Sequence, residues 1–146
     1  MLSLHETEEV KIGDITPFDG VSEDEKLRIG NEAVDELLGN LKRKNKMISL
    51  IDEFNERKTK EAKFAYLCDK LDCDLQAKKY SDEGRCTIGC APKGLIDNPD
   101  IRKLILESGA KNVSDVFIAH DEGKYHGTVF AEIVQFLKEY NSKDKG

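Results

Sequence analysis

Apolar residues in this chain recur every three or four positions, in segments with their own start and stop signals. This spacing places them on one side of an α-helix, and no pair of segments shows the alternation that paired strands require. The sequence therefore predicts an all-α protein. The segments expected to be helical are about 23–42, 47–54, 60–80, 98–109 and 128–140, with a loop over 81–93.

Helix starts are marked at two places. Ser22 and Glu25 form the Ser-x-x-Glu pattern of a capping box, in which the Ser22 side chain accepts from the amide of Glu25. Asn98 followed by Pro99 reads as an N-cap with proline at the first helical position, and Gly109 ends that helix. The residues expected to face a core include Leu27, Ala33, Val34, Leu37, Leu38 and Leu41 of the first helix, and Val129, Phe130, Ile133, Val134 and Leu137 of the last.

Length and charge narrow the class of protein. The 146 residues are enough for one core-forming unit. The net charge of −6 disfavours nucleic-acid binding, because that affinity depends on basic groups displacing counterions. No apolar run reaches the ~20 residues of a membrane span, and the first residues lack the pattern of a signal peptide. We expect a cytoplasmic protein with reduced cysteines, in which Cys86 and Cys90 either pack or bind zinc.

The first candidate site is acidic and carries one histidine. If Leu2 to Lys11 is helical, His5, Glu6 and Glu9 lie on one side of that helix. An imidazole beside two carboxylates is a suitable ligand set for a divalent cation. The alternative is a solvated acidic helix end with no ligand.

The second candidate is Asp69, in the segment 60–80. At about 100° per residue, this helix has a broad apolar side and a narrow solvated side, and Asp69 falls on neither. Its carboxylate is expected to be partly buried and to need a cation, a donor or a proton. The alternative is a structural salt bridge, with Arg28, Arg57 or Arg102 as partner. The apolar side is formed by Phe64, Leu67, Cys68, Leu71 and Leu75, and the solvated side by Lys63, Lys70 and Asp74.

The run His120-Asp121-Glu122-Gly123, with Tyr125 and His126 nearby, contains the residue types of a metal site. It stands just before a glycine, so the simpler interpretation is the end of a short helix. A cationic histidine stabilises a helix C-terminus by roughly 0.3–1 kcal/mol. We expect a structural role for His120.

Two blocks of sequence together resemble the HD-domain metal-dependent phosphohydrolases, and most closely the 5′-deoxynucleotidase-like branch. The resemblance covers about residues 2–80. The first block is Leu4-His5-Glu6-x-x-Glu9-x-x-x-Gly13-Asp14-Ile15-Thr16-Pro17, followed by Ser22-x-x-Glu25-Lys26. The second is Glu61-Ala62-Lys63-Phe64-x-x-x-x-Asp69-Lys70-x-x-x-x-Leu75-Gln76-Ala77.

The resemblance implies an HD-like helical bundle that hydrolyses a small phosphomonoester, in particular a (deoxy)nucleoside 5′-monophosphate. It implies a divalent metal (Mn, Co, Mg, Fe or Zn) that polarises a phosphate oxygen and activates water. By position, His5 and Glu6 match the doublet that names the family, and Asp69 matches its distant metal ligand. Glu9 matches a carboxylate that acts on the water or leaving group, and Asp14 matches an acidic residue that orients the substrate.

The chain departs from the family in two respects. The doublet is His-Glu rather than His-Asp, and the family's upstream helices, with their first metal-binding histidine, have no counterpart before His5. His120, His126 or another subunit could replace that ligand, and we expect a homo-oligomer. We expect residues 1–80 to carry the metal site and residues 81–146 to extend the same domain. The alternative function is a degenerate HD-like module that binds a nucleotide, a metabolite or a protein partner without turnover.

Overall fold

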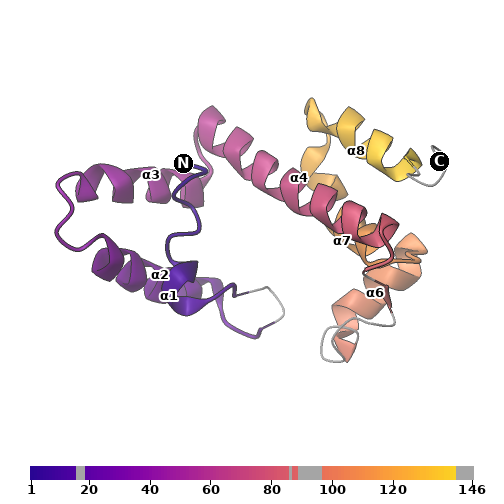
Figure 1. Ribbon diagram of the computed structural model, residues 1–146, viewed down its shortest axis with the longest axis horizontal. Helices are drawn as coiled ribbons and strands as arrows, with labels where there is room; N and C mark the ends of the chain where they lie inside the picture. The colour runs from indigo at the N-terminus through magenta and orange to yellow at the C-terminus, as the bar shows by residue number, and fades with distance from the viewer. Residues whose placement is uncertain (16–18, 86, 89–96, 141–146) are drawn as a thin grey trace. The chain divides into compact units, whose positions relative to one another are not determined.

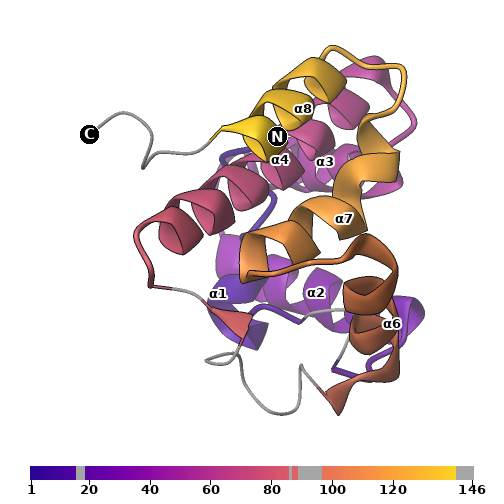
Figure 2. The same ribbon diagram turned by 90° about the vertical axis from the view of Figure 1, so that its right-hand side faces the viewer.

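A computed structural model describes residues 1–15, 19–85, 87–88 and 97–140 of the chain. Over these ranges the regular structure is helical and no strand occurs, which confirms the all-α prediction (Figures 1 and 2). No helix in the described ranges is both long enough and apolar enough to cross a membrane. The helices are α1 (Glu9–Ile12), α2 (Glu23–Leu38), α3 (Lys44–Glu56), α4 (Lys60–Asp82), α6 (Pro99–Ser108), α7 (Val113–Tyr125) and α8 (Phe130–Glu139).

The predicted caps are present. The Ser22 hydroxyl accepts from the Glu25 amide at 3.2 Å, although the Glu25 carboxylate pairs with Arg28. The Asn98 side chain accepts from the Asp100 amide at 2.8 Å, and Gly109 ends α6 in the left-handed conformation. Helix α2 stops at Leu38, earlier than predicted, because Gly39 takes a positive φ of 37°.

Two helical segments considered from the sequence have other extents in the structure. The segment Leu2 to Lys11 is not one helix: residues 2–8 form successive turns, and only Glu9–Ile12 is α-helical. The run around His120 is not the end of a short helix either, because α7 continues through Gly123 to Tyr125. Glycine lowers helix propensity by about 1 kcal/mol but does not forbid a helix that is buried on one side.

The chain forms two compact units, Met1–Tyr66 and Leu67–Gly146, with the boundary inside α4. In the first unit, α1 packs on α2, and α2 packs on α3. Its core is a cluster of Val34, Leu38 and Ile51, against which Leu4, Met47 and Ile48 pack. Leu4 thus ties the turns that precede α1 to this core.

The second unit is built around one face of α4. Helix α6 packs on α7, and α7 packs on α8. The core cluster contains Leu71 of α4 with Leu67 and Cys68 beside it, and the other members come from α7 and the α8 region. Those members are Ile118, Tyr125, Phe130, Val134 and Leu137.

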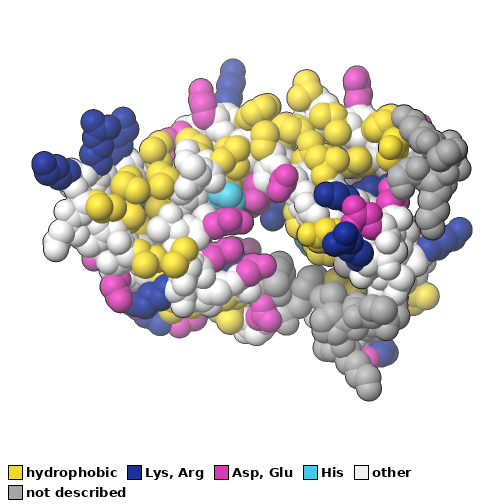
Figure 3. Space-filling model, in the orientation of Figure 1, with side chains coloured by type: hydrophobic (Ala, Val, Ile, Leu, Met, Phe, Trp, Pro, Cys, Tyr) yellow, Lys and Arg dark blue, Asp and Glu magenta, His cyan; other side chains and the backbone are white. Residues whose placement is uncertain are grey.

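Several residues expected to face a core are exposed. Leu27, Leu37 and Leu41 of the first predicted helix lie at the surface, as do Phe64 and Leu75 of α4. In the α8 region, Phe130, Val134 and Leu137 are buried, but Ile133 and the N-cap residue Val129 are exposed, Val129 by 73%. Figure 3 shows apolar side chains on the surface over this helix. On α2, α4 and α8 the apolar stripe is thus wider than the buried face of the helix.

Candidate metal centre

His5 is held in one orientation by its neighbours in the first unit. Its Nδ1 lies 2.6 Å from the carbonyl oxygen of Leu2, and its ring lies 4.8 Å from that of Phe54, between centroids. Because a carbonyl oxygen only accepts hydrogen bonds, Nδ1 is the donor in this contact. The contact favours the tautomer with the proton on Nδ1, which leaves the lone pair of Nε2 available to a metal. Metal-binding histidines are commonly oriented in this way by a backbone carbonyl. The His5 side chain is only 15% exposed.

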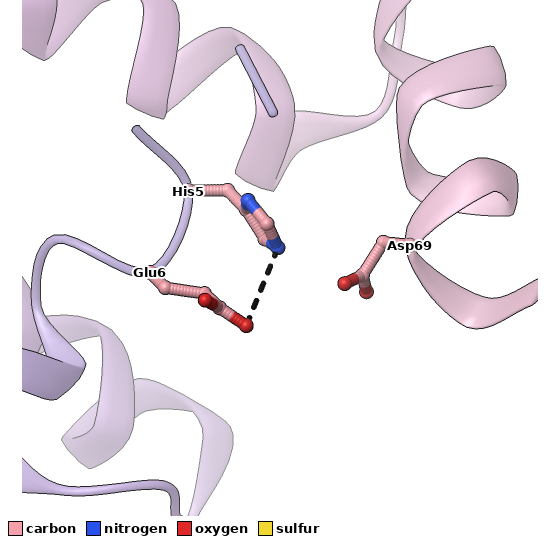
Figure 4. A group of neighbouring side chains, drawn as sticks. All are labelled: His5, Glu6 and Asp69. Carbon is pink, nitrogen blue, oxygen red and sulfur yellow. Dashed lines mark ion pairs between the residues drawn. The ribbon is translucent and has the colours of Figure 1, made fainter. Parts of the chain in front are cut away.

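Glu6 lies beside this nitrogen. Its Oε1 is 3.8 Å from Nε2 of His5, as the dashed line in Figure 4 marks. Two ligand atoms that each lie about 2.0–2.2 Å from one ion are at most about 4.4 Å apart, so this pair fits a shared cation. The Glu6 side chain is 66% exposed, which leaves its carboxylate room to adjust. The chemistry and spacing of this pair therefore suit a divalent metal.

Glu9 begins α1 in an acidic environment. Partial burial raises its pKa, and the nearby carboxylates of Asp14 and Glu6 raise it further, whereas Lys26 lowers it. Asp14 itself is exposed. Glu9 thus lies within electrostatic reach of two other predicted site residues, Glu6 and Asp14. These surroundings disfavour the charged form of Glu9.

Glu8 packs closely against α2, a contact that the helical spacing does not predict. A Cβ built on Gly30 of α2 would lie 3.0 Å from a carboxylate oxygen of Glu8, so a glycine here lets this side chain approach the helix closely. Burial raises the pKa of Glu8, and Lys26 lowers it. Lys26 also donates to the carbonyl oxygen of Ile15 at 2.5 Å. The sequence feature that could have indicated this contact is Gly30, a glycine in the middle of the helix predicted over 23–42.

Asp69 belongs to the second unit and projects from α4; Figure 4 draws it too. Its side chain is 24% exposed, as expected for a position between the apolar and solvated sides, and lies 3.3 Å from Nζ of Lys70. The arginines considered as partners have other contacts. Arg28 pairs with Glu25 and Glu32, Arg57 lies over the ring of Tyr66, and Arg102 pairs with Asp97.

The other candidate ligands, His120, His126, Cys86 and Cys90, follow later in the chain than Asp69. Nδ1 of His120 lies 2.5 Å from Asp121, which is buried and also pairs with Lys124. These contacts fit the structural role expected for His120, and His126 follows the last residue of α7. Cys86 and Cys90 lie outside the described residues.

Asp74 lies in the core and not on the solvated side of its helix, where the sequence predicts it. Its side chain is 0% exposed. Its carboxylate accepts a hydrogen bond from the Tyr125 hydroxyl of α7 at 2.8 Å. Spacing along α4 could not reveal this contact, because its partner lies on another helix.

Comparison with curated proteins finds relatives from different mammals that carry the same name. The 5′-deoxynucleotidase HDDC2 of Homo sapiens is 28% identical over 126 residues, which cover 82% of this chain and 62% of the relative. The protein of the same name from Mus musculus is 31% identical over 111 residues, covering 71% of this chain and 56% of the relative. The chain thus spans about three fifths of the length of these curated relatives. No solved structure matches.

The match to a family model covers most of the chain. The model described as "HD domain" matches residues 1–93, which include the His5-Glu6 doublet and Asp69. This family was expected from the two sequence blocks, and the match confirms that expectation. The helical fold agrees with it. The chain belongs to the HD-domain family.

Proposed function

We propose that this protein is a metal-dependent phosphohydrolase acting on a small phosphomonoester, with (deoxy)nucleoside 5′-monophosphates as the substrate class. The observation that carries the proposal is the HD-domain match over residues 1–93. The relatives named 5′-deoxynucleotidase support the substrate class. The orientation of His5 beside Glu6 supports a metal at the doublet, because both donor atoms fit one cation.

His5, Glu6 and Asp69 are the proposed metal ligands. One imidazole and two carboxylates suit a hard or borderline divalent cation such as Mn²⁺, Co²⁺, Mg²⁺, Fe²⁺ or Zn²⁺. A bound cation of this kind supplies Lewis-acid polarisation of the phosphate and lowers the pKa of water. In the proposal, the contact with Leu2 holds the His5 ring so that Nε2 remains the ligand atom.

Glu9 is the proposed general acid and base. Burial and neighbouring carboxylates raise its pKa, which is the direction needed for a carboxyl group that must hold a proton closer to neutral pH. In this role Glu9 takes a proton from the attacking water or gives one to the leaving alcohol. Asp14, which acts on Glu9 electrostatically, is proposed to orient the water or the sugar hydroxyls of the substrate.

The test is the variant Asp69→Ala, assayed for metal content and for phosphate release. We expect the variant to lose bound metal in elemental analysis and to lose metal-dependent hydrolysis of a deoxynucleoside 5′-monophosphate. Asp72→Asn is the matched control, because it removes one carboxylate from the exposed side of the same helix. Unchanged metal stoichiometry in Asp69→Ala would exclude Asp69 as a ligand.

A binding module without turnover is the second candidate. The observation that favours it is the exposed Glu6 carboxylate, which stands one methylene further from the backbone than the aspartate of the family's doublet. Metal-dependent release of phosphate by the wild-type protein would exclude this candidate. Binding of a nucleotide without hydrolysis in the presence of Mn²⁺, Co²⁺ or Mg²⁺ would support it.

A further inference from the structure

The side chain of Asp74 is enclosed in the core of the second unit. It is 0% exposed, and it lies one turn after Leu71, a member of the core cluster. Its Oδ2 accepts the hydroxyl hydrogen of Tyr125 at 2.8 Å. Its Oδ1 has no hydrogen-bond partner among the described residues. A buried carboxylate oxygen without a donor is costly when the group is ionised, and a proton on it removes most of that cost.

The charged groups around Asp74 do not neutralise it. From α7, Asp121 repels a negative charge on Asp74 and Lys124 attracts it, but Lys124 is already paired with Asp121. From α4 itself, Lys70 exerts a weaker attraction, and its Nζ lies 3.3 Å from Asp69. Phe130, Val134 and Leu137 contribute apolar surface from the α8 region. The nearest lysines are therefore shared with other carboxylates.

We propose that Asp74 is a proton-operated latch that joins α4 to α7. In the protonated state, the Asp74 carboxyl and the Tyr125 hydroxyl remain paired, and neither of the two groups carries a charge. In the ionised state, the buried charge beside Asp121 weakens the packing of α7 against α4, so that this part of the second unit opens more readily. The latch is a property of the second unit and does not depend on the proposed function.

The direction of the pH effect follows from the carboxyl group. Burial raises the pKa of Asp74 to about 6 from its ordinary value of 3.8, and the hydrogen bond from Tyr125 only partly opposes this. A carboxyl with a raised pKa in the folded state favours folding below its unfolded pKa. This contribution is lost as the pH rises through the folded value. The second unit should therefore lose stability between about pH 4 and pH 6.

The test compares three full-length proteins, the wild type, Asp74→Asn and Asp72→Asn, in urea unfolding at pH 4 and pH 7. The two variants lose the same charge from the same helix, but Asp72 is exposed. A pKa difference of about two units corresponds to a change on the order of a hundredfold in the unfolding equilibrium constant. We expect the wild type and Asp72→Asn to carry this pH-dependent loss, and Asp74→Asn to lack it.

A direct titration keeps the proposal falsifiable if Asp74→Asn does not fold. The carboxyl carbon of Asp74 in the wild-type protein is followed by NMR between pH 3 and pH 8. A midpoint near 6 supports the latch, and in Tyr125→Phe, which removes the donated hydrogen bond, the midpoint should move to higher pH. A midpoint below about 4.5, close to that of an ordinary aspartate, would overturn it. The proposal would also be overturned if the stability of Asp74→Asn and that of Asp72→Asn depended equally on pH.

Discussion

Burial raises the pKa of three carboxyl groups, those of Glu8, Glu9 and Asp74, and the surroundings of Glu9 and Asp74 differ in kind. Glu9 is partly buried beside other carboxylates, so its charge is disfavoured by burial and by repulsion. Asp74 is fully buried with a single hydrogen bond. Glu9 remains accessible to a substrate, whereas Asp74 can act only through the packing around it.

The variant Glu9→Gln tests the first of these groups. Glutamine keeps the size of the side chain but cannot transfer a proton, so we expect phosphate release to fall by about 10²–10⁴-fold with metal content unchanged. If Glu9 acts as the acid, the wild-type rate also falls as the pH rises above its raised pKa, because the protonated form is lost. Glu23→Gln, on the exposed surface of α2, is the control. Activity within tenfold of wild type in Glu9→Gln would contradict the assigned role.

The pairing and burial of some side chains could be predicted from the sequence alone, whereas those of others could not. His5 and Glu6 are adjacent in the chain, so their pairing is local and could be anticipated. The partial burial of Asp69 followed from its place between two helix sides. The burial of Asp74 did not, because helical spacing identifies neighbours on the same helix and not the hydroxyl that arrives from α7.

Helix ends were predicted well where a side chain caps them. Ser22, Asn98 and Gly109 all act at the ends of the helices that they were expected to mark. Capping is a local interaction over three or four residues, so it can be read from sequence. The turns before α1 could not be predicted in the same way. The packing of Leu4 on the core and the close approach of Glu8 to Gly30 help to hold that segment in place.

Asn112→Ala tests how strongly a cap holds α7. The Asn112 side chain accepts from the Asp115 amide at 3.1 Å and from the hydroxyl of buried Ser114 at 2.6 Å. Removing it should lower the free energy of unfolding by about 1–2 kcal/mol, measured by urea denaturation. Ser49→Ala is the control, because Ser49 is exposed in the middle of α3 and its hydroxyl donates to the carbonyl oxygen of Lys46 in the same helix. A loss no larger than in this control would show that the cap is dispensable.

At the scale of the whole molecule, the predicted homo-oligomer remains to be tested. Val129, Ile133 and Phe136 of the α8 region are exposed and lie three or four residues apart, and Phe136 is 59% exposed. Such a strip favours burial against another surface. We expect light scattering after size exclusion to give a mass above the 16.5 kDa of one chain. Phe136→Glu should reduce that mass.

The control for this experiment is Leu106→Glu, which places the same charge at an exposed apolar residue on α6. It should leave the mass unchanged if the contact involves the α8 strip. A wild-type protein of 16.5 kDa across the accessible concentration range would rule out the oligomer.

The sequence by itself determined the helical class, the capped ends and the family. Each of these depends on residue spacing or on short motifs, in which the interacting groups are near one another along the chain. Only the tertiary structure decided which part of each apolar stripe is covered, how the turns around His5 orient its ring, and that Asp74 is buried against Tyr125. These features depend on contacts between distant segments, and a helical period does not specify which neighbour a face will meet.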